Sequence, residues 1–470
     1  MFEEQGSFFE EEDYNSHIER FEKMLSKDES YFFDVDVFEF LAEHYLEDGN
    51  VDQALAALEV GISQHPSSAI ILLRKAQIHS STGRIRSGHE LLNKAESLAP
   101  NHDEIFLTRA SLYSQEHKHN DAIKNFLKAI DLCSNEEIDD LYLDLAFEYE
   151  NIEKYDLAVI ALKKALKLNP ENEGALYEIG YCFDQDERME ACVEFCLTFL
   201  DDNPYSFTAW YILGNTYSKM DQFEEAIASY DYCIIIKDSF SSAYFNSANC
   251  YGQMEDYTTA ISLYFKTFEH ESEQAITHNY IAECYEKLDD KENALKHYDL
   301  AIALDDKLGD AWLGKAIVKD TLGLTAESVQ LLKVATEIDE KNHEYWYVLG
   351  EAYEKLEKYE SAKDCYEIVI SLEPTSINGW LDLSNVLTET DSLERAVEVI
   401  QEGLETNKDN DELMYRLVAY LLQSGRNESA KSQLQIALDK NFKAHDKLFN
   451  YYPEAQNIND VLSIIETFKK

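Results

Sequence analysis

The sequence is poor in glycine and proline, with only 16 Gly and 6 Pro in 470 residues. Strand-rich folds depend on these residues for their many turns, so their scarcity argues against a β-sandwich. Apolar residues make up 45% of the chain, and it has 30 Tyr and 23 Phe. This composition is typical of helices packed on helices with aromatic side chains between them. We therefore expect an ordered all-α protein.

Basic residues are also scarce. The 41 Lys and Arg stand against 92 Asp and Glu, which gives a formal net charge of −51. Such a surface repels phosphate backbones and anionic lipids, because both are bound mainly through Lys and Arg. We expect neither nucleic acid nor a membrane as a partner. The charge itself has two explanations, which are solubility alone and the attraction of basic partners.

Long apolar runs are missing as well. No run approaches the roughly eighteen residues of a membrane-spanning helix, and the first residues carry no secretory pattern. No two of the eight cysteines are spaced C-x-x-C. They fit buried apolar positions in a reducing compartment, so we expect a cytoplasmic protein.

The common motifs of catalysis and of nucleotide or metal binding are absent too, including G-x-G-x-x-G, G-x-x-x-x-G-K-[ST], H-E-x-x-H and G-x-S-x-G. His117-Lys118-His119 offers two possible metal ligands, and Cys250 and Cys284 could approach each other. Solvated histidines in a turn and inert buried thiols explain these residues more simply. We therefore expect no enzyme, no cofactor and no metal site.

The prolines reveal an internal repeat. Pro66 and Pro100 are 34 residues apart, Pro170 and Pro204 share the same spacing, and Pro374 lies five periods beyond Pro204. The tryptophans share a second phase of this period, at Trp210, Trp312, Trp346 and Trp380. If these prolines are position 32, about twelve repeats begin at residues 35, 69, 103, 139, 173, 207, 241, 275, 309, 343, 377 and 411.

Two repeats display an almost complete motif. The sixth has Trp210, Leu213, Gly214, Tyr217, Ala226 and Tyr230, and the tenth has Trp346, Leu349, Gly350, Tyr353, Ala362, Tyr366 and Pro374. A period of 34 with W-x-x-L-G-x-x-Y, a small residue, an aromatic and a proline resembles the tetratricopeptide repeat. The resemblance covers roughly residues 35–442, which is nearly the whole chain.

The resemblance implies an all-α, right-handed superhelical solenoid of about twelve helix-turn-helix repeats, with a helix A and a helix B in each. We expect an acidic N-terminal segment with a capping helix at 1–34, the repeat array at 35–442 and C-terminal capping helices at 443–470. The expected caps are residues 14–28 and 445–468, where apolar residues recur at helical spacing.

Small residues at positions 8 and 20 indicate close contact between helices A and B. Position 8 is Ala or Gly in ten of twelve repeats, and position 20 is Ala, Gly, Ser or Cys in all twelve. We expect Gly214 to face Ala226 and Gly350 to face Ala362. Repeats five, nine and eleven depart from the pattern, and we expect looser packing of their hairpins.

In this family the concave face is lined by helix A. Its positions 5 and 9 in repeats five to eight hold aromatics beside asparagines and an acid, and these are the candidate peptide-binding residues: Tyr177, Tyr181, Tyr211, Asn215, Phe245, Asn249, Asn279 and Glu283. Amide side chains both donate and accept hydrogen bonds, as an extended peptide backbone requires. The arrangement resembles the asparagine ladder of O-linked N-acetylglucosamine transferases. A solvated polar face remains the simpler alternative.

A clamp for a partner's C-terminal carboxylate is improbable, because Glu39, Glu43, Glu351 and other acids occupy the face that would hold it. We expect a non-catalytic scaffold or adaptor that binds an extended, basic or neutral segment of another protein in its concave groove. The alternative is a regulatory subunit that docks on a partner enzyme through its outer surface.

Overall fold

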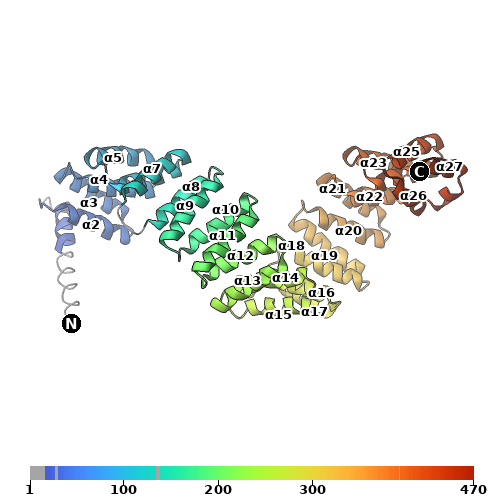
Figure 1. The fold of residues 1–470 in the computed structure, drawn as a ribbon, viewed down its shortest axis with the longest axis horizontal. Helices are drawn as coiled ribbons and strands as arrows, with labels where there is room; N and C mark the ends of the chain where they lie inside the picture. The colour runs from blue at the N-terminus through green and yellow to red at the C-terminus, as the bar shows by residue number, and fades with distance from the viewer. Residues whose placement is uncertain (1–15, 27–29, 134–137, 391, 470) are drawn as a thin grey trace. The chain divides into compact units, whose positions relative to one another are not determined.

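The computed structural model describes residues 16–26, 30–133, 138–390 and 392–469. Regular structure within these ranges is helical, without a strand, so the predicted all-α class is confirmed. The chain divides into two compact units, Met1–Asp238 and Ser239–Lys470. In both units consecutive helices pair as antiparallel hairpins (Figure 1).

The first unit contains six hairpins. Its A helices are α2 (Val35–Glu47), α4 (Ala69–Ser81), α6 (Asp103–Gln115), α8 (Asp139–Glu150), α10 (Glu173–Gln185) and α12 (Phe207–Lys219). Its B helices are α3 (Val51–Gln64), α5 (Ile85–Leu98), α7 (His119–Leu132), α9 (Tyr155–Leu168), α11 (Met189–Asp202) and α13 (Phe223–Ile236).

The second unit contains six more hairpins. Its A helices are α14 (Ser241–Gln253), α16 (Ala275–Lys287), α18 (Gly309–Thr321), α20 (His343–Lys355), α22 (Ile377–Thr390) and α24 (Asp411–Gln423). Its B helices are α15 (Tyr257–Thr267), α17 (Lys291–Leu304), α19 (Thr325–Ile338), α21 (Tyr359–Leu372), α23 (Leu393–Thr406) and α25 (Asn427–Asn441). Every A helix begins at the residue where the sequence period places the start of a repeat. The handedness of a superhelix and the number of true family repeats stay predictions.

The turn from A to B uses a residue in the left-handed region at position 15. Glycine provides it in four repeats, at Gly49, Gly83, Gly323 and Gly425. Seven other repeats use His, Glu or Asp with φ between 51° and 62°. The following N–H closes the turn on the carbonyl of position 11, as from Lys358 to Tyr353 at 2.9 Å. This bond is the signature of a Schellman cap.

The four tryptophans stand at the same position of their repeats, and each makes the same hydrogen bond. In each case the indole N–H donates to the carbonyl of position 32 in the preceding repeat, over 2.9–3.0 Å. Trp210 and Trp380 reach the carbonyls of Pro204 and Pro374. The tryptophan therefore fixes helix A against the end of the previous helix B, where the proline terminates that helix.

The glycines at position 8 make room for an aromatic ring. A Cβ atom at Gly350 would lie 2.7 Å from the ring of Tyr366, and one at Gly214 would lie 2.5 Å from the ring of Tyr230. The nearest atoms to these glycines thus belong to the tyrosine at position 24, and their facing the small residue at position 20 stays a prediction. The ring of the tyrosine at position 24, on helix B, packs against helix A at the glycine and occupies the volume that a Cβ atom would need.

Helices also cover both ends of the paired array. Residues 16–26 are helical, and Phe21 is fully buried, with ring centroids 6.4 Å from Phe33 and 6.2 Å from Tyr45. Tyr14 of the expected cap lies outside the described residues. After α25 come η1 (Phe442–Ala444), α26 (Asp446–Tyr451), η2 (Pro453–Asn457) and α27 (Asn459–Phe468), with α26 against α24 and α27 against α25.

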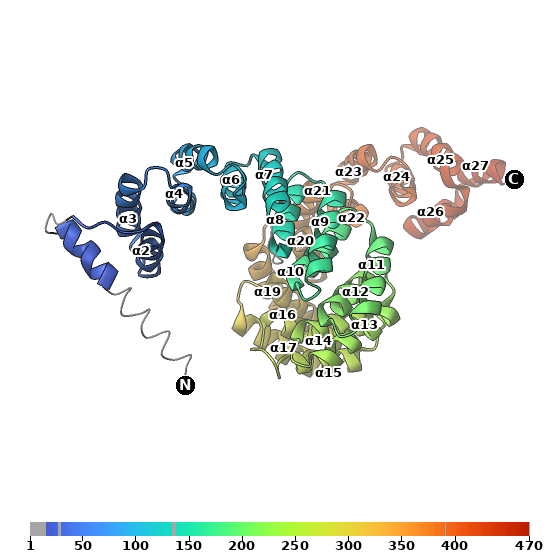
Figure 2. The ribbon, with the colours of Figure 1, turned by 60° about the vertical axis from the view of Figure 1, so that its left-hand side comes forward.

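The A helices form the inner row of each unit. Besides packing on their own B helices, successive A helices approach one another directly, as α2 with α4, α10 with α12 and α16 with α18. A layered array in which one row is more closely spaced curves with that row on its inside. Figure 2 shows the first hairpins, α2 to α6, stacked in chain order.

Looser packing is found in two of the three irregular repeats. α10 and α11 of repeat five approach each other less than the helices of the other hairpins do, whereas α18 and α19 of repeat nine pack as closely as their neighbours. The hairpin of α22 and α23 is as close as the first one and less close than most of the others. The expectation is confirmed for repeats five and eleven and wrong for repeat nine. Among the described helices, none is both long and apolar enough to cross a bilayer.

Candidate binding surface on the A helices

The candidate residues of the first unit lie on α10 and α12. Tyr177 and Tyr181 are exposed, at 37% and 46%, while Tyr211 and Asn215 are half-buried. The rings of Tyr177 and Tyr211 meet edge to face, with centroids 6.5 Å apart. These contacts hold two rings of successive A helices in place at the surface, so the first unit presents an aromatic ledge.

The candidate residues of the second unit lie on α14 and α16. Phe245 and Asn249 are half-buried, and Glu283 is exposed. The Phe245 ring packs edge to face with Tyr280, with centroids 5.6 Å apart. Asn279 is only 2% exposed. The expectation that it stands on the exposed strip is therefore wrong, because its amide is buried beneath its neighbours.

Asn279 instead positions an acid. Its amide nitrogen donates to the Glu283 carboxylate over 2.6 Å, one helical turn along α16. The Asn279 carbonyl oxygen has no hydrogen-bond partner among the described residues. Asn279 is thus a support beneath the surface, and Glu283 is the group that reaches solvent.

The other two asparagines accept hydrogen bonds from buried tyrosines. Tyr230 donates to the carbonyl oxygen of Asn215 over 2.8 Å, and Tyr264 donates to that of Asn249 over 2.5 Å. Both tyrosines are at least 98% buried. The half-buried asparagines are therefore part of the hairpin packing as well as of the surface, which the alternative of a solvated polar face does not include.

Several carboxyl groups on the A helices have a pKa that burial raises, and the repeat motif does not specify these acids. Within the described residues, burial raises the pKa of eight carboxyl groups, one of which is Asp231 on the B helix α13. The other seven lie on A helices at positions 6, 9 or 12 of their repeats, which form one helical face: Asp144, Glu150, Glu178, Glu283, Glu351, Glu354 and Asp382.

Mutual repulsion adds to the effect of burial in the second unit. Glu283 reaches solvent, yet desolvation by the surrounding helices raises its pKa, and the charges of Asp310 and Glu286 raise it further. The pKa of Glu351 is raised by desolvation and then by Asp382. Burial is the larger cause in both cases, and the neighbouring acids outweigh the lowering by Lys287 at Glu283 and by Lys355 at Glu351.

Two acids at the same repeat position show how a nearby cation changes the pKa of a carboxyl group on this face. Asp320 and Glu354 both stand at position 12 of an A helix. Lys355 lies 2.5 Å from Asp320 and, with Thr325, offsets desolvation and lowers the pKa of that carboxyl. Glu354, which accepts a hydrogen bond from Tyr366 over 3.1 Å, has a raised pKa because desolvation and Asp382 prevail.

His119, one of the two histidines considered as possible metal ligands, bonds to Glu148 over 2.9 Å. The Cys182 thiol donates to Glu150 over 3.3 Å, and burial raises the pKa of the thiol and that of Glu150, the latter to about 7. A thiol with a raised pKa is protonated and a poor nucleophile. The described part of the chain has no group of three or more potential metal ligands.

Family comparisons agree with the repeat structure. Models described as tetratricopeptide repeats match residues 41–103, 139–172, 195–228, 278–308 and 343–376. No curated protein matches the sequence.

Solved structures of related architecture also align. YrrB, described as a tetratricopeptide-repeat protein with an unusual peptide-binding site, is 21% identical over 40% of this chain and 96% of its own, with a TM-score of 0.33. The Cut9-Hcn1 hetero-tetramer of APC/C aligns at 14% identity over 85% of this chain and 92% of the other, with a TM-score of 0.41. The structure of Naa15/Naa10 bound to HypK-THB aligns at 13% identity over 93% of this chain and 78% of the other, with a TM-score of 0.37.

The family matches recur along the chain, and those at 139–172 and 343–376 coincide with whole repeats of the period found in the sequence. Stacked arrays of such hairpins are protein-interaction scaffolds. The chain belongs to the tetratricopeptide-repeat proteins.

Proposed function

We propose that this protein is a non-catalytic scaffold that binds an extended, basic segment of another protein along the inner row of A helices. The observation that carries the proposal is the face of acids on the A helices, whose pKa values are raised by burial and, for Glu283, Glu351 and Glu354, also by neighbouring acids. A lysine or arginine of a partner would do for Glu351 and Glu354 what Lys355 does for Asp320.

The aromatic ledge supports the same function. Tyr177 and Tyr181 offer exposed ring surface, and Tyr211 stands beside Tyr177. Rigid rings provide contact area at low entropic cost and tolerate different peptide sequences. In this proposal Tyr177, Tyr181 and Tyr211 contact the segment in the first unit. Phe245, Asn249 and Glu283 contact it in the second, with Asn279 holding Glu283.

Charge neutralisation tests the proposal. The variant Glu351→Gln with Glu354→Gln removes two acids from the A helix α20 and preserves their shape. Its matched control is Glu360→Gln with Glu367→Gln, which removes two exposed acids from the B helix of the same repeat. A fluorescein-labelled 15-residue peptide of alternating lysine and threonine is the probe, with binding followed by anisotropy.

We expect the α20 variant to bind the peptide at least tenfold more weakly and the α21 control to bind it as the wild type does. Both variants change the net charge equally, so general attraction to an acidic protein would weaken both alike. Equal affinities of the two variants would therefore contradict an inner-face site.

A further inference from the structure

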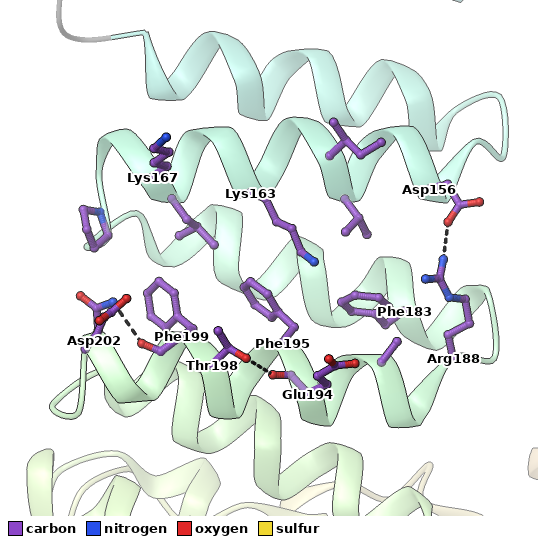
Figure 3. Close-up of a pocket in the computed structure, with 16 residues that line it drawn as sticks. Asp156, Lys163, Lys167, Phe183, Arg188, Glu194, Phe195, Thr198, Phe199 and Asp202 are labelled. Carbon is purple, nitrogen blue, oxygen red and sulfur yellow. Dashed lines mark hydrogen bonds and ion pairs between the residues drawn. The ribbon is translucent and has the colours of Figure 1, made fainter.

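A second surface lies on the outer side of the first unit, between the B helices α9 and α11. It is a groove of about 1050 Å³ that follows both helices and ends near Pro170 and Asn203 (Figure 3). Its floor contains the buried Phe183 of α10 and the half-buried rings of Phe195 and Phe199. Phe195 lies 6.3 Å from Phe183 and 6.0 Å from Phe199 between ring centroids.

The groove follows from the irregular fifth repeat. α11 packs less closely on α10 than other B helices do on their partners. Its inward positions 20 and 24 hold Cys192 and Cys196, where most other repeats have Ala at position 20 and a larger Leu, Ile, Phe or Tyr stands at position 24. Position 24 of this hairpin therefore has no aromatic ring to pack against α10. Phe195 and Phe199 of α11 are only half-buried, so part of each ring is exposed.

The two walls of the groove carry opposite charges. Lys163 and Lys167 project from α9, and Glu194 and Asp202 project from α11 (Figure 3). The Lys163 ammonium lies 5.1 Å from the centre of the Phe195 ring. None of these four charges makes an ion pair with another described residue. Two lysines without a carboxylate partner are notable in a chain of net charge −51.

The length and form of the groove indicate which kind of ligand would fit it. Its lining runs from Asp156 to Lys167 on α9 and from Arg188 to Asp202 on α11. At 1.5 Å per residue this is about 20 Å, or three to four turns of a helix. Asp156 and Arg188 pair across one end. An apolar trough of this length between two parallel helices has the form that an amphipathic helix fills.

We propose that this groove is a docking site for an amphipathic helix of another protein. An apolar ridge of that helix enters between Ile160 and Phe195, an acidic flank faces Lys163 and Lys167, and a basic flank faces Glu194 and Asp202. Charge complementarity with both walls selects this partner. A nucleic acid would meet as many acids as lysines. The site is separate from the inner-face site and does not depend on it, so the protein would hold two partners at once.

The test is a selection followed by mapping. A displayed library of 18-residue helical peptides is selected on the full-length protein, and each selected peptide is then tested against the Ile160→Asp variant. Ile160 is 54% exposed in the groove, and Leu157, which is 43% exposed on the same helix, does not line it. Leu157→Asp is therefore the matched control, because both variants place the same charge at an exposed site.

We expect the selected peptides to carry an apolar ridge and an acidic flank. They should bind Leu157→Asp as they bind the wild type and bind Ile160→Asp at least tenfold more weakly. Lys163→Glu with Lys167→Glu should weaken binding, and a peptide whose acidic flank is changed to lysine should restore it. Lys164→Glu is the control, since Lys164 stacks near Tyr142 outside the groove.

Four results would overturn the proposal. Peptides without an acidic flank, or peptides insensitive to Ile160→Asp, would place binding elsewhere. A sedimentation experiment in which Ile160→Asp dissociates a dimer would assign the groove to a second copy of the chain. Phe8 and Phe9 are apolar residues of the acidic N-terminal segment. Selection that succeeds only after Phe8→Ala with Phe9→Ala would assign the groove to that segment of the same chain.

Discussion

The hydroxyl of Tyr264 on α15 donates to the side-chain carbonyl of Asn249 on α14 over 2.5 Å, and so joins the buried centre of a hairpin to the candidate binding surface. Tyr264 is 2% exposed, and burial raises the pKa of its hydroxyl. The asparagine thus has two functions, because it accepts a structural bond and also presents its amide at the surface.

A double-mutant cycle should detect this coupling. Asn249→Ala leaves a buried hydroxyl without its acceptor, which should lower local stability by about 1–3 kcal/mol. Tyr264→Phe should cost less, since water can reach the half-buried Asn249. The double variant should be less destabilised than the sum of the two, with a coupling of about 0.5–1.5 kcal/mol. Hydrogen exchange of α14 and α15 amides measures it, and additive effects would contradict the bond.

Two glycines of the second unit should respond oppositely to alanine. At Gly350 a new Cβ would meet the Tyr366 ring at 2.7 Å, so Gly350→Ala should destabilise repeat ten by about 1–3 kcal/mol. At Gly252 nothing lies within 4 Å of the new Cβ. Gly252→Ala should therefore stabilise α14 by about 0.5–1 kcal/mol. Exchange protection in each hairpin distinguishes them, and a stabilising Gly350→Ala would refute the role of the ring.

The left-handed turns predict a stabilising substitution. Glu357 has φ of 57°, a conformation that strains an L-residue by about 1 kcal/mol or more. Glu357→Gly should raise the thermal midpoint, although glycine's greater freedom in the unfolded chain offsets part of the gain. The reciprocal variant Gly323→Ala has free space around its Cβ, so any loss comes from φ alone. A gain from Gly323→Ala would show that the turn is unstrained.

The fold could be predicted from the sequence because the period is carried by residues with packing functions. The prolines and tryptophans kept their phase since an indole N–H must reach the carbonyl of position 32, as in Trp346 with Glu340 at 3.0 Å. The starts of the A helices follow from that phase. The division of the chain between Asp238 and Ser239 has no such marker in the sequence.

The candidate site was less predictable because burial depends on neighbours in space. Positions 5 and 9 are equivalent in every repeat, yet Tyr177 is exposed and Asn279 is buried. The acids at positions 6 and 12 were visible in the sequence, but the desolvation that raises the pKa of Asp382 was not. Likewise, the unusual residues of repeat five indicated looser packing without indicating a groove.

Two buried histidines meet in repeat eight. The Nδ1 atoms of His278 and His297 are 3.0 Å apart, and the two side chains are 2% and 5% exposed. Only one proton fits between those nitrogens, because one must donate and the other accept. The other nitrogen of His278 bonds to Glu273 over 3.2 Å. Burial, followed by the charges of His278 and Lys296, lowers the pKa of His297 to about 4.

This pair should make α17 less stable in mild acid. Above pH 6.5 His297 is neutral in both folded and unfolded chains; between pH 6.5 and about 4 only the unfolded chain takes up its proton, so folding stability falls. The loss between pH 7 and pH 5 should be about 2 kcal/mol. Hydrogen exchange of α17 amides, corrected for the intrinsic rate, should show this loss in the wild type. His297→Gln should preserve a hydrogen bond to His278 and remove the titration, so its stability should depend less on pH. Parallel pH profiles for the two proteins would mean that His297 is protonated equally in both states, and the buried pair would then have no part in acid stability.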